Sequence, residues 1–197
     1  MYTDIDTSNV SDFSMCLHGC NSLQTINVDT WDTGNATSFY QLFMKCNSLK
    51  YVNVANWNVN YVTDMREMFA ECSALFSLDL SGWETSRLRN ASGMFNSCTG
   101  LVALDISGWK TTNIESISMP PNVKYIIMDD DSDIKFKGNY AMPDPNNYVK
   151  YLVPSTMVDA YKAHANWSGR ASRIVDIGDY TIIRYNGEVE VTKNDDD

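Results

Sequence analysis

The residues best suited to nucleophilic or metal chemistry are five cysteines, but their regular spacing is typical of residues that pack in the core of a repeat protein. Cys20, Cys46, Cys72 and Cys98 follow one another at steps of 26 residues, and Cys16 lies four residues before Cys20. A zinc site uses short Cys-x-x-Cys pairs with histidine nearby, and a disulfide framework uses irregular, paired spacings. Neither pattern is present, so we interpret the cysteines as free thiols that fill small spaces in the core. Free thiols are compatible with both reducing and oxidising compartments, so the cysteines do not indicate where in or outside the cell the protein is found.

Other catalytic patterns are equally sparse. The two histidines, His18 and His164, lie in different parts of the chain. The sequence has no G-x-S-x-G, no phosphate-binding loop, no dinucleotide-binding glycine pattern and no cluster of metal ligands. No feature points to a hydrolase with paired carboxylates either. We therefore predict a protein that is not an enzyme and that uses no cofactor and no metal.

Composition and charge narrow the class of protein further. Hydrophobic residues make up 44% of the 197-residue chain, enough for a packed core, and the formal net charge is −10. Scattered Lys and Arg give no basic surface for nucleic acid or anionic lipid. No apolar run reaches the roughly 18 residues of a membrane span. The polar N-terminus lacks a signal-peptide core, so the chain is not secreted or its leader has been removed.

A 26-residue repeat organises the first two-thirds of the chain. Trp31, Trp57, Trp83 and Trp109 recur at the same step as the cysteines. This period lies in the range of leucine-rich repeats, in which each copy forms one coil of a solenoid. We interpret the tryptophans as a stacked aromatic column that closes one corner of the solenoid. The alternative is an exposed strip that binds sugars, which Ile5 at the equivalent position disfavours.

Each copy has two halves with different hydrophobic periods. In the copy that starts at Trp57, apolar residues from Val62 to Leu75 are spaced by three or four, which predicts a short helix. Leu78 and Leu80 then flank a polar residue, as in a short strand. We therefore predict an α/β leucine-rich-repeat solenoid with a small α+β C-terminal cap. It would have about 4.5 coils, each made of a short strand, a turn and a short helix.

The repeat also carries a family resemblance. Its pattern is W-x-T-x-x-V-x-x-M-x-x-M-F-x-x-C-x-S-L-x-x-L-x-L, represented in one copy by Thr85, Met94, Phe95, Cys98, Leu101, Leu104 and Ile106. Over residues 5–128 this pattern resembles the BspA-like leucine-rich repeats of bacterial surface proteins and lipoproteins. The segment 151–177 is similar to the one that closes the C-terminal end of such solenoids. The resemblance implies secretion or surface display and adhesion or partner binding, without catalytic residues.

We divide the chain into three parts. The solenoid spans 1–128, the C-terminal cap spans 129–177, and a β-hairpin with an acidic tail spans 178–197. The acidic run 129–133 is predicted to be a solvated turn, since no Asp-x-Asp-x-Asp-Gly framework for calcium surrounds it. The first coil has no capping segment before it, so we expect missing residues or another subunit to cover it, which makes a homo-oligomer possible through this end.

Two signals stand out near the C-terminus. Thr156 with Asp159 matches a capping box, which predicts a short helix that ends at about residue 164. Asn186-Gly187 between alternating segments predicts a hairpin of residues 180–184 and 188–192. A lone hairpin is weak, so it must dock on the solenoid, on a following domain or on another chain.

The outward positions of the predicted strands are the candidate binding residues, because this sheet face is the usual recognition surface of such solenoids. They are Tyr51, Asn27, Asn53, Asp79, Asp105 and Ser77. Tyr51 is the large aromatic among them and the best single anchor. Asp79 beside Asp105 places like charges on neighbouring strands, which indicates a cation, a basic partner or neither. The alternative for all six is that they are ordinary solvated strand residues.

We expect a non-catalytic recognition or adhesion module of a bacterial surface or secreted protein. It would bind a protein or a glycan through the solenoid surface and lie outside the cell or on its surface. The alternative is a structural or receptor-binding component of a larger particle, such as a phage appendage, located in the virion. In either class we expect no nucleic-acid binding and no membrane insertion.

Overall fold

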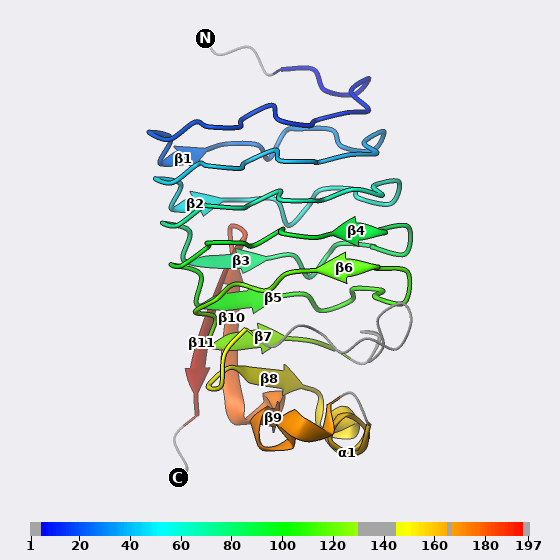
Figure 1. Ribbon diagram of the computed structural model, residues 1–197, viewed down its shortest axis with the longest axis vertical. Helices are drawn as coiled ribbons and strands as arrows, with labels where there is room; N and C mark the ends of the chain where they lie inside the picture. Colours follow the sequence, from blue (N-terminus) through cyan, green and yellow to red (C-terminus); the bar gives the residue numbers. More distant parts are fainter. Residues whose placement is uncertain (1–4, 130–144, 165–166, 195–197) are drawn as a thin grey trace.

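The chain folds into a β-solenoid of about five turns with little helix, closed by a small helix and a hairpin near the C-terminus. The computed structural model describes residues 5–129, 145–164 and 167–194. The turns stack along the long axis of the molecule (Figure 1). The predicted acidic turn, apart from Asp129, and the acidic tail 195–197 lie outside the described residues.

One wall of the solenoid is a column of short parallel strands. β1 (Thr25–Ile26) pairs with β2 (Tyr51–Val52). The next five form one sheet in the order β3 (Ser77–Asp79), β5 (Ala103–Asp105), β7 (Tyr125–Ile127), β8 (Lys150–Val153) and β9 (Ile174–Asp176). The partners Thr25 and Tyr51, and likewise Ser77 and Ala103, are separated by the 26-residue repeat. The solenoid prediction is therefore confirmed, and the cap strands β8 and β9 extend the same sheet.

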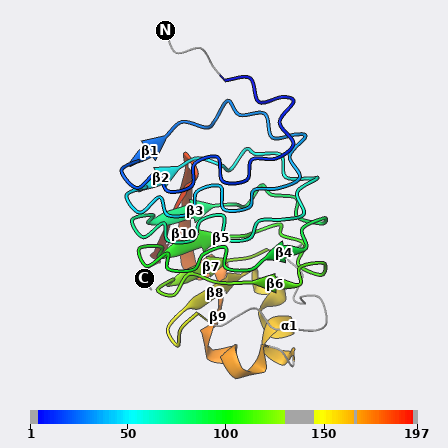
Figure 2. The ribbon, with the colours of Figure 1, turned by 45° about the horizontal axis from the view of Figure 1, so that its top comes forward.

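A second ladder runs along a different wall of each turn. β4 (Asn90–Ala91) pairs with β6 (Ser116–Ile117) in parallel. Single bridges continue this ladder toward the N-terminus through Asp64, Ser38 and Asp12, again at the repeat spacing. Figure 2 shows the two strand columns on separate walls of the same stack. The second ladder also links the turns around β2 and β3, which are not paired with each other in the first wall.

The predicted helix in each copy is wrong. Within the described residues, the α-helix α1 (Val158–Ala163) and the short 3-10 helices η2 (Ser155–Met157), η3 (Ser168–Arg173) and η4 (Ile177–Asp179) all lie near the C-terminus. In the copies, tight turns replace the helix. Gln41 and Lys45 have φ of 55° and 65°, and Glu67 has φ of 55°, which is left-handed backbone that a helix excludes.

The hydrogen bonds explain why the sequence of these turns has the hydrophobic spacing of a helix. Gln41 and Phe43 donate their N–H groups to the carbonyls of Arg66 and Met68 in the next turn, both at 2.9 Å. Leu42, between them, donates to Phe39 three residues back at 3.2 Å. Alternate residues thus bond as in a sheet while the others close turns. The resulting zigzag brings every third or fourth side chain inward, as a helix would.

The cysteines form a buried file through the turns. Cys46, Cys72 and Cys98 are fully buried, and the Sγ of Cys72 and Cys98 donate to the carbonyls of Phe43 and Phe69 at 3.1 and 2.9 Å. Burial raises the pKa of Cys46 to about 11 and that of Cys98 to about 12, so these thiols stay protonated and able to donate. All five cysteines are free thiols, as predicted. The prediction that they fill the core is confirmed for these three and is wrong for Cys16, which is exposed.

The tryptophans form a second buried file. The indole Nε1 of Trp57, Trp83 and Trp109 each donates to a backbone carbonyl of the preceding turn, at 3.2, 2.9 and 3.0 Å. Trp83 and Trp109 are stacked with ring centroids 6.2 Å apart and an interplanar angle of 6°. Trp31 is half-buried at the open end of the file. The interpretation as a core column is confirmed, and the alternative of an exposed sugar-binding strip is wrong.

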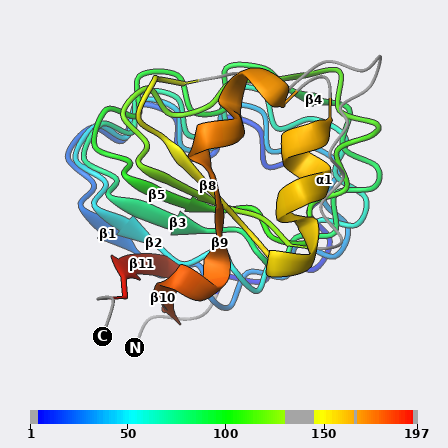
Figure 3. The same ribbon diagram turned by 90° about the horizontal axis from the view of Figure 1, so that it is seen from below.

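The two ends of the stack differ. At the C-terminal end α1 and η3 lie across the last turn (Figure 3), and the ring of Trp167 meets those of Tyr151 and Tyr161 edge-on at 5.0 and 5.1 Å. The predicted helix starts as η2, whose N-cap is Pro154, so Thr156 lies inside the first turn and not at the N-cap position that the predicted capping box needs. In the first turn, inward side chains such as Leu17 and Leu23 are half-buried. Their cover by a second copy stays a prediction.

The predicted hairpin is confirmed. β10 (Tyr180–Tyr185) and β11 (Glu188–Lys193) pair antiparallel around Asn186-Gly187, whose φ values are 52° and 79°. Two positive φ values in a two-residue loop match the twist of the strands. Within the described residues, no helix has both the length and the apolar character needed to cross a bilayer.

Candidate binding surface beside the hairpin

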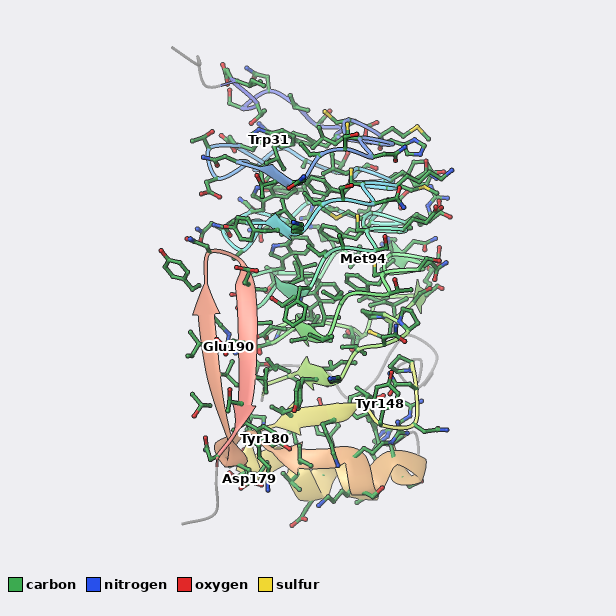
Figure 4. All side chains as sticks on the ribbon, turned by 90° about the vertical axis from the view of Figure 1, so that its left-hand side faces the viewer. Trp31, Met94, Tyr148, Asp179, Tyr180 and Glu190 are labelled. Carbon is green, nitrogen blue, oxygen red and sulfur yellow. The ribbon has the colours of Figure 1, made fainter. Side chains whose placement is uncertain are left out.

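The hairpin docks on the outer face of the strand column of its own chain. It runs along the stack, across the strands, with its tip toward the N-terminal turns (Figure 1). Figure 4 shows the same arrangement from the side, with Tyr180 at the base of the hairpin. β11 lies against β3 and β5. Of the three docking partners that the sequence left open, the structure selects the solenoid.

Polar contacts fix the hairpin on the acidic part of this face. Arg184 places both Nε and Nη2 at 2.6 Å from Oδ2 of Asp105, whose side chain is completely buried. Ser107 Oγ donates to the other carboxylate oxygen at 2.5 Å. Burial nevertheless raises the pKa of Asp105, because desolvation outweighs the stabilisation of the carboxylate by Ser107 and Arg184. Arg184, a basic side chain of the same chain, is therefore the partner of Asp105 in this structure.

Backbone contacts and apolar packing complete the docking. The Asp79 N–H donates to the Gly187 carbonyl at 2.8 Å, and the Val189 N–H donates to Ser77 Oγ at 3.1 Å. A second small core forms between the hairpin and the sheet from Ala103, Ile127, Leu152 and Val189. At the hairpin base the rings of Tyr125 and Tyr180 meet edge-on at 5.8 Å.

The docking covers half of the predicted binding residues. Ser77, Asp79 and Asp105 are 4%, 5% and 0% exposed in the folded chain. An external ligand could reach Asp79 and Asp105 only if the hairpin left the sheet. Their role in ligand binding stays a prediction, while their observed role is to hold the hairpin.

The other three predicted residues lie toward the N-terminal end of the face. Asn27 is exposed, and Tyr51 and Asn53 are half-buried. Asn53 lies directly beneath the hairpin tip, because a Cβ added to Gly187 would meet the Asn53 Cα at 2.7 Å. The pKa of Tyr51 is raised by partial burial and then by the charges of Asp29 and Glu188, which places this ring beside the tip of the hairpin in an acidic setting.

An open groove of about 720 Å³ lies between the hairpin and the edge of the solenoid. Its lining is mainly apolar: Phe76, Val102, Ala103, Tyr125, Ile183, Tyr185, Val189 and Val191, with Ser77, Lys124, Glu188 and Glu190 as the polar members. Three of the apolar side chains remain largely exposed, with Phe76 at 59%, Ile183 at 54% and Tyr185 at 72%. Large apolar groups of this kind gathered around one hollow indicate an interaction site.

Sequence reasoning missed this groove because it considered only the strand residues. Phe76 lies one position before β3, and its equivalents in the two preceding copies are Gln24 and Lys50. The change from polar to aromatic at one repeat position was a readable signal. Within the described residues, no three potential ligands among His, Cys, Asp and Glu converge to hold a metal ion.

Comparison with known protein families gives a match only within the repeats. Residues 37–120 match the sequence model of a family described as "Mycoplasma protein of unknown function, DUF285". This span begins just before Ser38 in the second ladder and ends shortly after β6. No curated protein matches the chain.

Proposed function

We propose that this protein is a non-catalytic recognition module that binds a segment of a partner protein in the groove beside the hairpin. The observation that carries the proposal is the groove itself, with its exposed Phe76, Ile183 and Tyr185. Exposed aromatic side chains at the rim of a preformed hollow are the usual anchors of protein interfaces.

The lining favours a peptide over a glycan. Most of its side chains are aliphatic or aromatic, which suits a buried apolar side chain, whereas sugars need many hydrogen-bonding groups. Glu188 and Glu190 lie on the hairpin side of the groove, and the whole chain carries a net charge of −10. Charge complementarity therefore favours a segment that carries Lys or Arg beside its apolar anchor.

The cellular setting belongs to the same proposal. The repeat pattern resembles BspA-like leucine-rich repeats, and this resemblance supports display on a bacterial surface or secretion, with a role in adhesion. The match of residues 37–120 to a family of unknown function adds no activity to it. An adhesion module needs a rigid scaffold with an exposed anchoring site. Here the solenoid is the scaffold and the groove is the anchoring site.

A selection from short random peptides displayed on phage tests the proposal. We expect the enriched peptides to share an aromatic or aliphatic residue flanked by Lys or Arg. Replacing Phe76 or Tyr185 by alanine should weaken binding of a selected peptide about tenfold, the loss of one interface anchor worth about 1.4 kcal/mol. Fluorescence anisotropy of the labelled peptide measures the dissociation constant.

The matched control is Tyr148→Ala. Tyr148 is a 54% exposed aromatic residue that lies away from the hairpin (Figure 4), so its loss should leave the affinity unchanged. Equal affinity of the Phe76→Ala, Tyr185→Ala and control variants would overturn the groove as the binding site. Selective binding of glycans from an array, with no enriched peptide, would overturn the choice of partner.

A further inference from the structure

Two arginines of the fourth turn, Arg87 and Arg89, replace polar residues that tie neighbouring turns together in other copies. The positions equivalent to Arg87 in the neighbouring copies are occupied by Asn35, Tyr61 and Asn113. The side-chain amides of Asn35 and Asn113 donate to the carbonyls of Ser8 and Ser86, both at 2.7 Å. These bonds tie neighbouring turns together. Arg87 makes no such bond within the described residues, so its guanidinium is free of this structural task.

The position of Arg89 shows the same departure. Its equivalents in the two preceding copies, Thr37 and Thr63, direct their hydroxyl groups to backbone carbonyls of the preceding turn, at 3.0 and 3.4 Å. In the following copy the equivalent is Glu115, whose N–H donates to the Arg89 carbonyl at 2.7 Å. Among the described residues, neither Arg87 nor Arg89 forms an ion pair, although the chain contains 25 acidic residues. Two guanidinium groups that have no carboxylate partner and line the same hollow favour an anion there.

The two arginines line one small polar hollow. It measures about 310 Å³ and is formed by Thr63, Ser86, Arg87, Arg89 and Asn113, which come from three successive turns. The Arg87 guanidinium carbon lies 4.7 Å from the centre of the Tyr61 ring, so stacking restricts its orientation. This hollow shares no lining residue with the groove beside the hairpin.

We propose that this hollow is a binding site for a single acidic sugar unit. A guanidinium group binds a carboxylate or a sulfate through two parallel hydrogen bonds. The hydroxyl groups of Thr63 and Ser86 offer partners for sugar hydroxyls, and the Tyr61 ring offers an apolar face next to them. The volume is at the lower end for ligand sites, which suits one sugar unit. The site does not depend on the peptide groove and adds a second ligand class to the proposed function.

Competing anions fit less well. A long polyanion such as nucleic acid would meet the net charge of −10 beyond the hollow, whereas a single acidic group contacts only the two arginines. An acidic peptide would need apolar or backbone-pairing surface, and the hollow lining is hydroxyl, amide and guanidinium groups. The sugar carboxylate and sugar sulfate share the same recognition chemistry, and the experiment separates them.

Titration followed by NMR on the full chain tests this site, with the arginine side-chain N–H signals as the readout. The probes are methyl glucuronide, glucose 6-sulfate, neutral methyl glucoside and inorganic phosphate. We expect the glucuronide or the sulfated sugar to shift the signals of both arginines with a dissociation constant on the order of 1 mM, and the neutral glucoside to leave them in place. Arg87→Ala and Arg89→Ala should each weaken binding about tenfold.

Arg66→Ala is the matched control. Arg66 is also an exposed arginine stacked on a tyrosine, but its guanidinium is already paired with Asp64 at 2.6 Å, so its loss should not change sugar affinity. Thermal unfolding checks that each variant is folded. The proposal is overturned if the acidic sugars bind no better than methyl glucoside. It is also overturned if phosphate alone binds, or if the Arg66 variant weakens binding as much as the other two.

Discussion

Replacing Trp83 by alanine is expected to lower the free energy of unfolding by about 3–5 kcal/mol, the range for loss of a large buried aromatic side chain. Trp83 is 1% exposed and stacks on Trp109. Its Nε1 donates to the Val54 carbonyl at 2.9 Å, so the truncation also leaves a buried acceptor without its partner. Denaturation in guanidinium chloride, followed by circular dichroism, measures the change.

Trp31→Ala is the control for this prediction. Trp31 belongs to the same file and stacks on Trp57 at 5.8 Å, but it is only half-buried at the open end. Its truncation should cost about 1–2 kcal/mol because less apolar surface is lost from the core. If the two variants are destabilised equally, the tryptophans do not form a file whose burial increases from the first turn inward.

Gly187→Ala is expected to release the hairpin tip from the solenoid. Gly187 has a φ of 79°, and a Cβ at this position would lie 2.7 Å from both the Cα and the Oδ1 of Asn53. The backbone strain and the clash together should cost about 2–3 kcal/mol. Because the Asp79 N–H donates to the Gly187 carbonyl, its hydrogen exchange should accelerate, and NMR can follow that single amide.

Gly19→Ala separates the clash from the strain. Gly19 also has a positive φ, of 74°, but a Cβ there meets nothing within 4 Å. We expect this variant to lose only the strain energy, about 1–2 kcal/mol, and to leave Asp79 exchange unchanged. Unchanged Asp79 exchange in Gly187→Ala would show that the tip does not rest on Asn53 and that the docking described above is incorrect.

The 26-residue repeat was enough to predict a solenoid from the sequence. It was not enough to predict the backbone conformation within each turn. The identical spacing of Cys46, Cys72 and Cys98 indicated stacked copies, and β3 lies in the segment where the alternation of Leu78 and Leu80 predicted a strand. The stripe from Val62 to Leu75 was assigned to a helix, since inward side chains at steps of three or four are typical of one. Left-handed residues are rarely readable from sequence when they are Gln, Lys or Glu instead of Gly.

The candidate site was only partly predictable for a related reason. Outward strand positions become apolar toward the C-terminus, from Asp79 to Ile127 and Leu152, which indicates a covering element. The sequence also contained a hairpin in need of a docking site. Nothing in the residues alone, however, specified that Arg184 would reach Asp105 across 79 positions, because such pairings depend on the path of the whole chain.

The central claim is that successive turns hydrogen-bond to one another where the sequence pattern resembles a helix. The most direct test is the NMR scalar coupling transmitted through a hydrogen bond to the amide nitrogen of Gln41. The structure predicts a coupling to the carbonyl carbon of Arg66, which accepts this bond at 2.9 Å from the next turn. A coupling to the carbonyl carbon of Thr37, four residues earlier, is what a helix would give, and it would contradict the solenoid described here.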